Sequence, residues 1–126
     1  MQKDEEIKIV NIQLIALIIA LISSIISIII TYNQKKDLEN KKTNFSSEEL
    51  FNITLFNRIL IIVLSFVFLY VNYKLYKISK DQGEDLKSYI LQIIASIITI
   101  IPGFIALYVV LLSSTEQIVD VENPII

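Results

Sequence analysis

Cysteine, histidine and tryptophan are absent from this 126-residue sequence, and glycine and proline occur only twice each. Without cysteine or histidine, the chain has no disulfide, no thiolate nucleophile and no metal site of the kinds that use these residues. It also has no glycine-rich phosphate loop and no pair of carboxylates within an apolar segment. We therefore expect no catalytic residues, no cofactor and no metal ligands, and expect that the protein is not an enzyme.

Charge is scarce in three long stretches of the chain. Hydrophobic residues make up 54% of the sequence, and no charged residue interrupts Leu14–Ile30, Ile59–Val71 or Ile93–Leu112. Runs of this length and apolarity are typical of membrane-spanning helices. The sequence predicts an all-α, small integral membrane protein with one membrane domain, 1–126, and three transmembrane helices at about 9–32, 53–75 and 89–112. Membrane lipids are then its immediate partners, and a net charge of −2 gives nucleic acid no reason to bind.

Polar segments separate the three predicted spans. The first is a loop over 33–46, in which Thr43–Asn44 is the expected end of the first helix. Ser46 and Glu49 have the spacing of a capping box, which indicates that the second helix begins there. Gly83 then suits the residue just past a helix end, so the second and third helices should form a tight hairpin through a short loop at 80–86. Asp85 is placed to cap the third helix.

The third helix and the C-terminal segment each have one further feature. Pro102 lies inside the span and predicts a kink rather than a break, with the hydroxyl of Thr99 as a candidate partner for the carbonyl that proline leaves free. The C-terminal tail, 113–126, is acidic and contains no basic residue.

The distribution of lysine gives a weak prediction of orientation. Basic residues are nearly balanced between the two sides, but Lys80 and Lys87 precede the third span and none comes after it. By the positive-inside rule we expect the N-terminus inside and the C-terminus outside. Lysine far outnumbers arginine, and both isoleucine and asparagine are frequent. This composition is typical of an AT-rich bacterial genome, so we expect a bacterial cell membrane.

Arg58 is the only ionisable residue close to the membrane interior. Such charges are often functional. We favour a simpler interpretation, in which Arg58 lies about one turn inside the second helix and extends outward to lipid phosphate; a transport or partner-binding role is the alternative. Lys74, Lys77 and Lys80 recur every three residues near the other end of that helix. They are expected to act as a general anchor to anionic lipid.

Small and polar residues recur at steps of three or four on the first and third helices. Such faces allow membrane helices to approach closely. The candidate packing residues are Ala16, Ala20, Ser23 and Ser27 on the first helix and Gln92, Ser96, Thr99 and Gly103 on the third. We expect these two stripes to face each other within one chain; they could instead form a homo-oligomer contact or line a pore. The second helix carries bulky aromatic residues and should face lipid or cradle the other two.

Two functions remain open at this point. The first is a non-catalytic membrane protein that works through helix–helix or loop contacts, as an accessory subunit, a regulator or an immunity-type protein, with a membrane protein partner or as a homo-oligomer. The alternative is a self-assembling membrane permeabiliser or small channel, which resembles phage holins in size and span number. The acidic tail argues against that alternative.

Overall fold

The computed structural model describes residues 2–42 and 45–116, and within them it contains three α-helices and no strand. They are α1 (Gln2–Leu38), α2 (Ser47–Asp81) and α3 (Lys87–Glu116). Each contains a segment long and apolar enough to cross a membrane, which confirms the predicted all-α, multi-pass fold. The predicted break at Thr43–Asn44 and residues 117–126 of the acidic tail lie outside the described residues.

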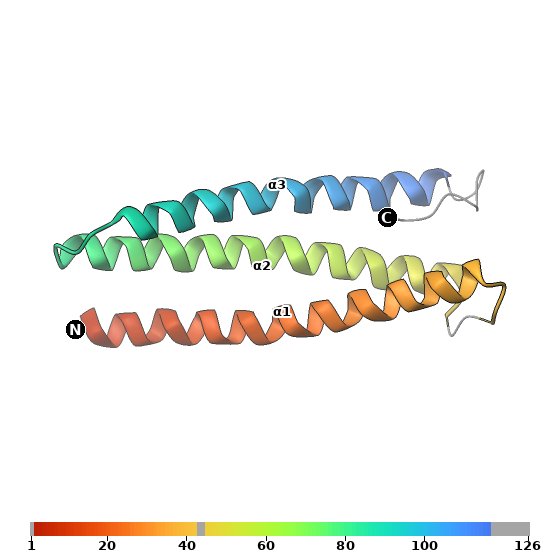
Figure 1. The fold of residues 1–126 in the computed structure, drawn as a ribbon, viewed down its shortest axis with the longest axis horizontal. Helices are drawn as coiled ribbons and strands as arrows, with labels where there is room; N and C mark the ends of the chain where they lie inside the picture. The colour runs from red at the N-terminus through yellow and green to blue at the C-terminus, as the bar shows by residue number, and fades with distance from the viewer. Residues whose placement is uncertain (1, 43–44, 117–126) are drawn as a thin grey trace.

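The three helices lie side by side in one layer, with α2 in the middle (Figure 1). Helix α2 packs against both neighbours, whereas no Cα atoms of α1 and α3 come within 8 Å of each other in the described part of the chain. The prediction that the small-residue stripes of the first and third helices face each other is therefore wrong. The buried members of each stripe pack against α2, which has the cradling position.

The ends of α2 follow from its sequence. Ser46 Oγ accepts a hydrogen bond from the Glu49 amide (3.2 Å), and the Ser46 amide donates to Glu49 Oε1 (3.1 Å), which is the predicted capping box. At the other end Gly83 has φ +73°. The amide of Glu84 donates to the carbonyl of Ser79 and that of Gly83 to Lys80, a Schellman motif. The tight hairpin between α2 and α3 is thus confirmed.

Helix α1 continues beyond its predicted span and ends at Leu38. Asn40 adopts the left-handed conformation with φ +58°, and the amide of Lys41 donates to the carbonyl of Lys36 at 2.8 Å. Asparagine tolerates this conformation better than most residues and can replace glycine after a helix. Residues 33–38 of the polar connection are helical, and the turn at Asn40 follows them.

The α1–α2 and α2–α3 interfaces are both built on a seven-residue repeat. The buried residues of α1 that recur at this spacing are Ile9, Ala16, Ser23 and Ile30, and those of α2 that face α1 are Asn57, Leu64, Val71 and Ile78. On α3 the repeat is Ser96, Gly103 and Val110. A repeat of 3.5 residues per turn keeps one seam facing a neighbour along a whole helix, as in a left-handed coiled coil.

Helix α3 continues through Pro102 without interruption. The predicted role of Thr99 is wrong, because its hydroxyl donates to the carbonyl of Ala95 (2.8 Å) instead of that of Ile98. Next to the proline, a Cβ atom added to Gly103 would lie 3.3 Å from Ile62 Cγ1. The absence of a side chain at Gly103 therefore permits the close approach of α3 to α2.

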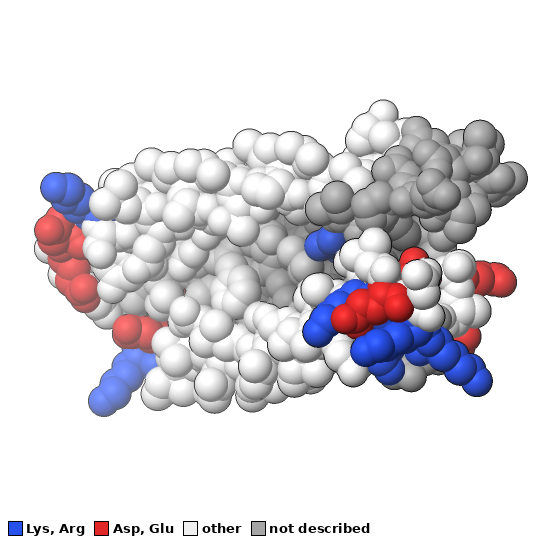
Figure 2. Space-filling view, turned by 45° about the vertical axis from the view of Figure 1, so that its right-hand side comes forward, with Lys and Arg blue, Asp and Glu red and all other residues white. Residues whose placement is uncertain are grey.

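Charged side chains gather at the two ends of the molecule, and the face seen in Figure 2 is mostly uncharged between them and recessed between the outer helices. One end holds the N-terminal turns of α1 and the α2–α3 hairpin, and the other holds the α1–α2 connection (Figure 1). Large apolar side chains such as Leu21, Ile28 and Ile98 are more than half exposed. A lipid bilayer is the environment that suits this band.

Candidate functional site

One buried asparagine holds α1 against α2. Asn57 is 1% exposed, and its Oδ1 accepts a hydrogen bond from Ser23 Oγ at 2.7 Å, while its Nδ2 donates to Ser27 Oγ at 2.9 Å. Both ends of the amide are therefore used by successive turns of α1. In an apolar environment such bonds fix the register of two helices, because a shift by one turn would leave the amide without partners.

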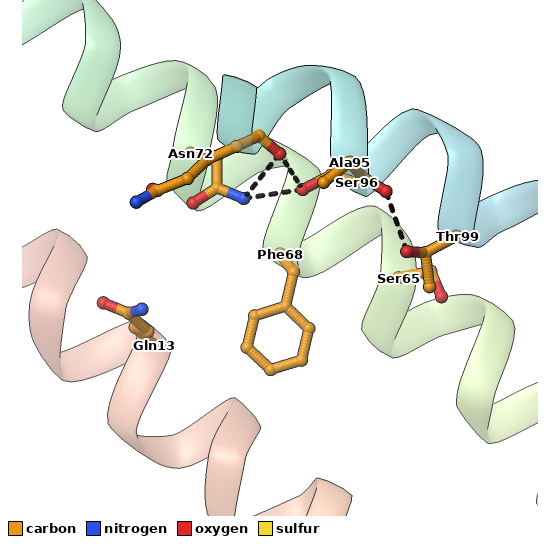
Figure 3. Close-up of a pocket in the computed structure, with 8 residues that line it drawn as sticks. Gln13, Ser65, Phe68, Asn72, Ala95, Ser96 and Thr99 are labelled. Atoms are coloured by element: carbon orange, nitrogen blue, oxygen red, sulfur yellow. Dashed lines mark hydrogen bonds between the residues drawn. The ribbon is translucent and has the colours of Figure 1, made fainter. Parts of the chain in front are cut away.

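A second asparagine holds α3. Asn72 Nδ2 donates to Ser96 Oγ at 2.6 Å, and Ser96 Oγ in turn donates to the backbone carbonyl of Gln92 at 2.9 Å (Figure 3). Helix α2 thus holds each neighbour by a different amide. The α1 contact lies towards the N-terminal half of α2, and the α3 contact lies close to the hairpin.

Because α1 and α3 do not touch, a groove of about 400 Å³ runs between them over α2. It is lined by Gln13 of α1, by Ser65, Phe68 and Asn72 of α2, and by Gln92, Ala95, Ser96 and Thr99 of α3. Figure 3 shows the amide of Gln13 across the groove from the Asn72–Ser96 pair, with the ring of Phe68 between the helices. We refer to these eight residues as the polar groove.

Several polar groups in the groove have capacity for more hydrogen bonds. The side-chain amides of Gln13 and Gln92 make none with another described residue; only the main-chain carbonyl of Gln92 is used. An amide carries two donors and an acceptor, and lipid hydrocarbon offers no partner to any of them. The polar groove is therefore suited to receive a polar side chain of a neighbouring helix.

Arg58 lies next to Asn57, at the level of the α1 serines that Asn57 bonds. Its neighbour Asn57 bonds to Ser23 and Ser27, well inside the apolar segment of α1. Nine residues separate Arg58 from Glu49, the nearest charged residue of α2, which is about 13 Å along a helix. Polar Asn52 and Thr54 lie between these two residues, and the predicted outward extension of Arg58 to lipid phosphate stays a prediction.

The guanidinium of Arg58 also lacks a partner among the described residues. Its Nε atom is buried and has no hydrogen-bond acceptor, and no carboxylate of the described residues forms an ion pair with it. A charge inside the bilayer is stable when it is paired or hydrogen-bonded. Arg58 is thus a second unsatisfied polar group within the span.

The three lysines of the predicted lipid anchor, Lys74, Lys77 and Lys80, lie in the last turns of α2. Lys74 is half-buried, with its Nζ atom 5.8 Å from the centre of the Tyr70 ring, and the other two are exposed. This end of α2 packs against α1 through Ile78 and Ile9. The lysines are therefore placed at the rim of the apolar band.

The eight small and polar candidates have different environments. Ala16, Ser23, Ser96 and Gly103 are buried, Ala20 and Ser27 are half-buried, and Gln92 and Thr99 are exposed. All those that are buried face α2. The sequence analysis did not identify Asn57, Asn72 or Gln13. Asn57 and Asn72 each lie seven residues from a buried residue of α2, and this spacing is the signal that identifies them.

The fold and the polar groove define a multi-pass membrane protein built as an open layer of three helices. No protein-family model, no curated protein and no solved structure matches the chain. Its function is therefore inferred from its own residues.

Proposed function

We propose that this protein acts by contact within the membrane, as an accessory subunit, a regulator or an immunity-type protein that binds another membrane protein. It performs no catalysis and needs no cofactor. The open polar groove carries the proposal. Its amide groups at Gln13 and Gln92 have no partner among the described residues, although they lie on helices that cross the apolar band.

The energetics of helices in lipid favour this function. Association there depends on close packing and interhelical hydrogen bonds, because lipid is as apolar as the side chains that a contact would bury. Within this chain the described hydrogen-bond pairs between helices are made by Asn57 and Asn72. A helix of another protein that fills the groove would add both packing and hydrogen bonds, so binding is favourable.

The alternative of a self-assembling permeabiliser has less support. A pore needs polar residues that face a water-filled lumen. Ser23, Ser27 and Ser96, which were candidates for such a lining, are bonded to asparagines of α2 instead. Overexpression in cells distinguishes the two functions: a permeabiliser arrests growth and releases small solutes, whereas a contact protein accumulates harmlessly.

We also propose a bacterial cell membrane as the location, with the N-terminus inside and the C-terminus outside. The lysines at the end of α2 and Lys87 at the start of α3 support this orientation, since basic residues are retained on the cytoplasmic side.

The decisive experiment extracts the protein from its native membrane in a lipid-preserving polymer and measures the mass and composition of the particle. We expect a second membrane protein at a fixed molar ratio. A homo-oligomer of defined size would favour the permeabiliser, and conductance in planar bilayers would be measured next. Isolation of the 14.5 kDa chain by itself would contradict a stable complex.

A further inference from the structure

We propose that the partner inserts a transmembrane helix that carries a carboxylate, and that this carboxylate pairs with Arg58 inside the bilayer. The inference rests on the proposed function and adds the chemistry of the partner. It follows from the position of Arg58 relative to the polar groove, from its buried Nε atom without an acceptor, and from the absence of an acidic residue in the apolar segments of this chain.

Arg58 lies in line with the floor of the groove. Arg58, Ser65 and Asn72 are seven residues apart on α2, and a seven-residue step returns to nearly the same face of a helix. Ser65 and Asn72 both line the groove. A helix that fills the groove over these two residues and continues along the same face of α2 therefore passes Arg58. The distance from Asn72 to Arg58 along α2 is about 21 Å, well within the length of one transmembrane helix.

The charge of Arg58 requires an anion that the described residues do not provide. No carboxylate lies within 4 Å of its guanidinium there, and its Nε atom is buried without an acceptor. Glu49, the nearest charged residue of α2, lies about 13 Å away along the helix, so no carboxylate of α2 itself is close to the guanidinium. A carboxylate accepts two parallel bonds from a guanidinium, and a bidentate pair of this kind satisfies both charges where water is absent.

A second copy of this chain does not satisfy Arg58. The segments Leu14–Ile30, Ile59–Val71 and Ile93–Leu112 contain no acidic residue. Two copies that met through their grooves would therefore bring two arginines into the bilayer and no carboxylate. Like charges in a medium of low dielectric constant repel strongly, so the occupant is a different protein.

Site-specific photo-crosslinking in the native membrane tests the proposal. A photoreactive amino acid is placed at Gln13 or Gln92, in the groove, and at Ile15 or Ile101 as matched controls. Both isoleucines are exposed and lie on the opposite side of the same helices, Ile15 about half a turn from Gln13 and Ile101 about two and a half turns from Gln92. We expect the two groove positions, but not the controls, to crosslink to one protein. Mass spectrometry should place the crosslink in a transmembrane segment that contains Asp or Glu.

Substitution of Arg58 then tests the pairing itself. Arg58→Leu should lower both the crosslinking yield at Gln92 and the amount of co-purified partner by about tenfold or more, since loss of one member leaves a buried charge alone. Arg58→Lys should retain part of the binding. Lys42→Gln, at an exposed residue, is the control for a change of charge outside the span. Arg58→Asp should also lose the partner, and should recover binding when the partner's carboxylate is changed to arginine.

The outcomes separate this inference from the proposed function. If a partner co-purifies at a fixed ratio but its crosslinked helix lacks a carboxylate, or Arg58→Leu leaves the yield unchanged, the contact function stands and this inference is wrong. Crosslinks to a second copy or to lipid alone also overturn it. If neutral variants at Glu116, Asp120 and Glu122 lower the yield as Arg58→Leu does, the chain's own tail is the anion. Absence of any partner contradicts the proposed function.

Discussion

At the scale of single residues, two amides on α2 determine where the outer helices lie. Asn57 bonds two serines of α1, and Asn72 bonds Ser96 of α3. Apolar contacts alone allow one helix to slide along another in lipid, because every depth offers similar surface. An amide between hydroxyls removes that freedom. These residues therefore specify the register of the layer as well as contributing to its stability.

Asn57→Leu should lower the free energy of unfolding by about 1 kcal/mol, the size measured for interhelical hydrogen bonds in membrane proteins. The loss is modest because a serine left behind can bond to its own helix, as Ser24 does to the carbonyl of Ala20. Equilibrium unfolding in bicelles measures the change. Asn52→Leu is the matched control, since Asn52 is an exposed amide of the same helix. Equal losses in the two variants would contradict the assigned role of Asn57.

The serines of these contacts were predictable from the sequence, but the asparagines were not. Ser23, Ser27 and Ser96 were identified because small polar residues are useful at any helix interface. Asn57 and Asn72, the asparagines that bond these serines, were not identified. A pattern of small residues shows that a face is packed, but the amide that bonds it lies on the partner helix. The small residues and the amide that bonds them can be recognised as one contact only when it is known which helices pair.

At the scale of the elements, the closest approach of α3 to α2 depends on Gly103. The helix continues past Pro102, and Gly103 lets Ile62 lie where a Cβ atom would be 3.3 Å away. Ser96, Gly103 and Val110 are the buried residues of the α3 repeat, so Gly103 is in the middle of the seam. A larger residue there should move the whole interface apart.

Gly103→Val should destabilise the protein by about 1–3 kcal/mol, the usual effect of overpacking a close contact. The double variant with Ile62→Ala should be less destabilised than the sum of the two single changes, because the alanine makes room for the added methyl groups. Steric trapping of the reconstituted protein gives the three free energies. Additive effects would mean that Gly103 acts through helix propensity and not through its contact with Ile62.

Helix position and order were predictable from the sequence, whereas the pairing of the outer helices was not. Capping at Ser46 and the turn at Gly83 depend on local chemistry, and both were predicted correctly. The expected contact between α1 and α3 was wrong. Short connections require α2 to lie beside α1 and α3, but no local signal requires the layer to close into a bundle. In lipid, closure gains little unless it adds close packing or hydrogen bonds.

At the scale of the whole molecule, the open layer leaves charge at its two ends and apolar surface along its sides (Figures 1 and 2). The end with the hairpin carries Lys74, Lys77, Lys80 and Lys87, and the other end carries Lys35, Lys36, Lys41 and Lys42 together with Glu48 and Glu49. The basic residues are similar in number at the two ends, so the charge bias that sets orientation is small.

The absence of cysteine makes this orientation directly testable. Lys41→Cys and Glu84→Cys place single thiols in the two exposed connections. With the N-terminus inside, a membrane-impermeant maleimide added to intact cells should label the thiol at position 41 and leave position 84 unlabelled until the cells are opened. The reverse pattern would overturn the proposed orientation. Labelling of about half of each variant would instead show that both orientations are inserted, as a nearly balanced distribution of lysine permits.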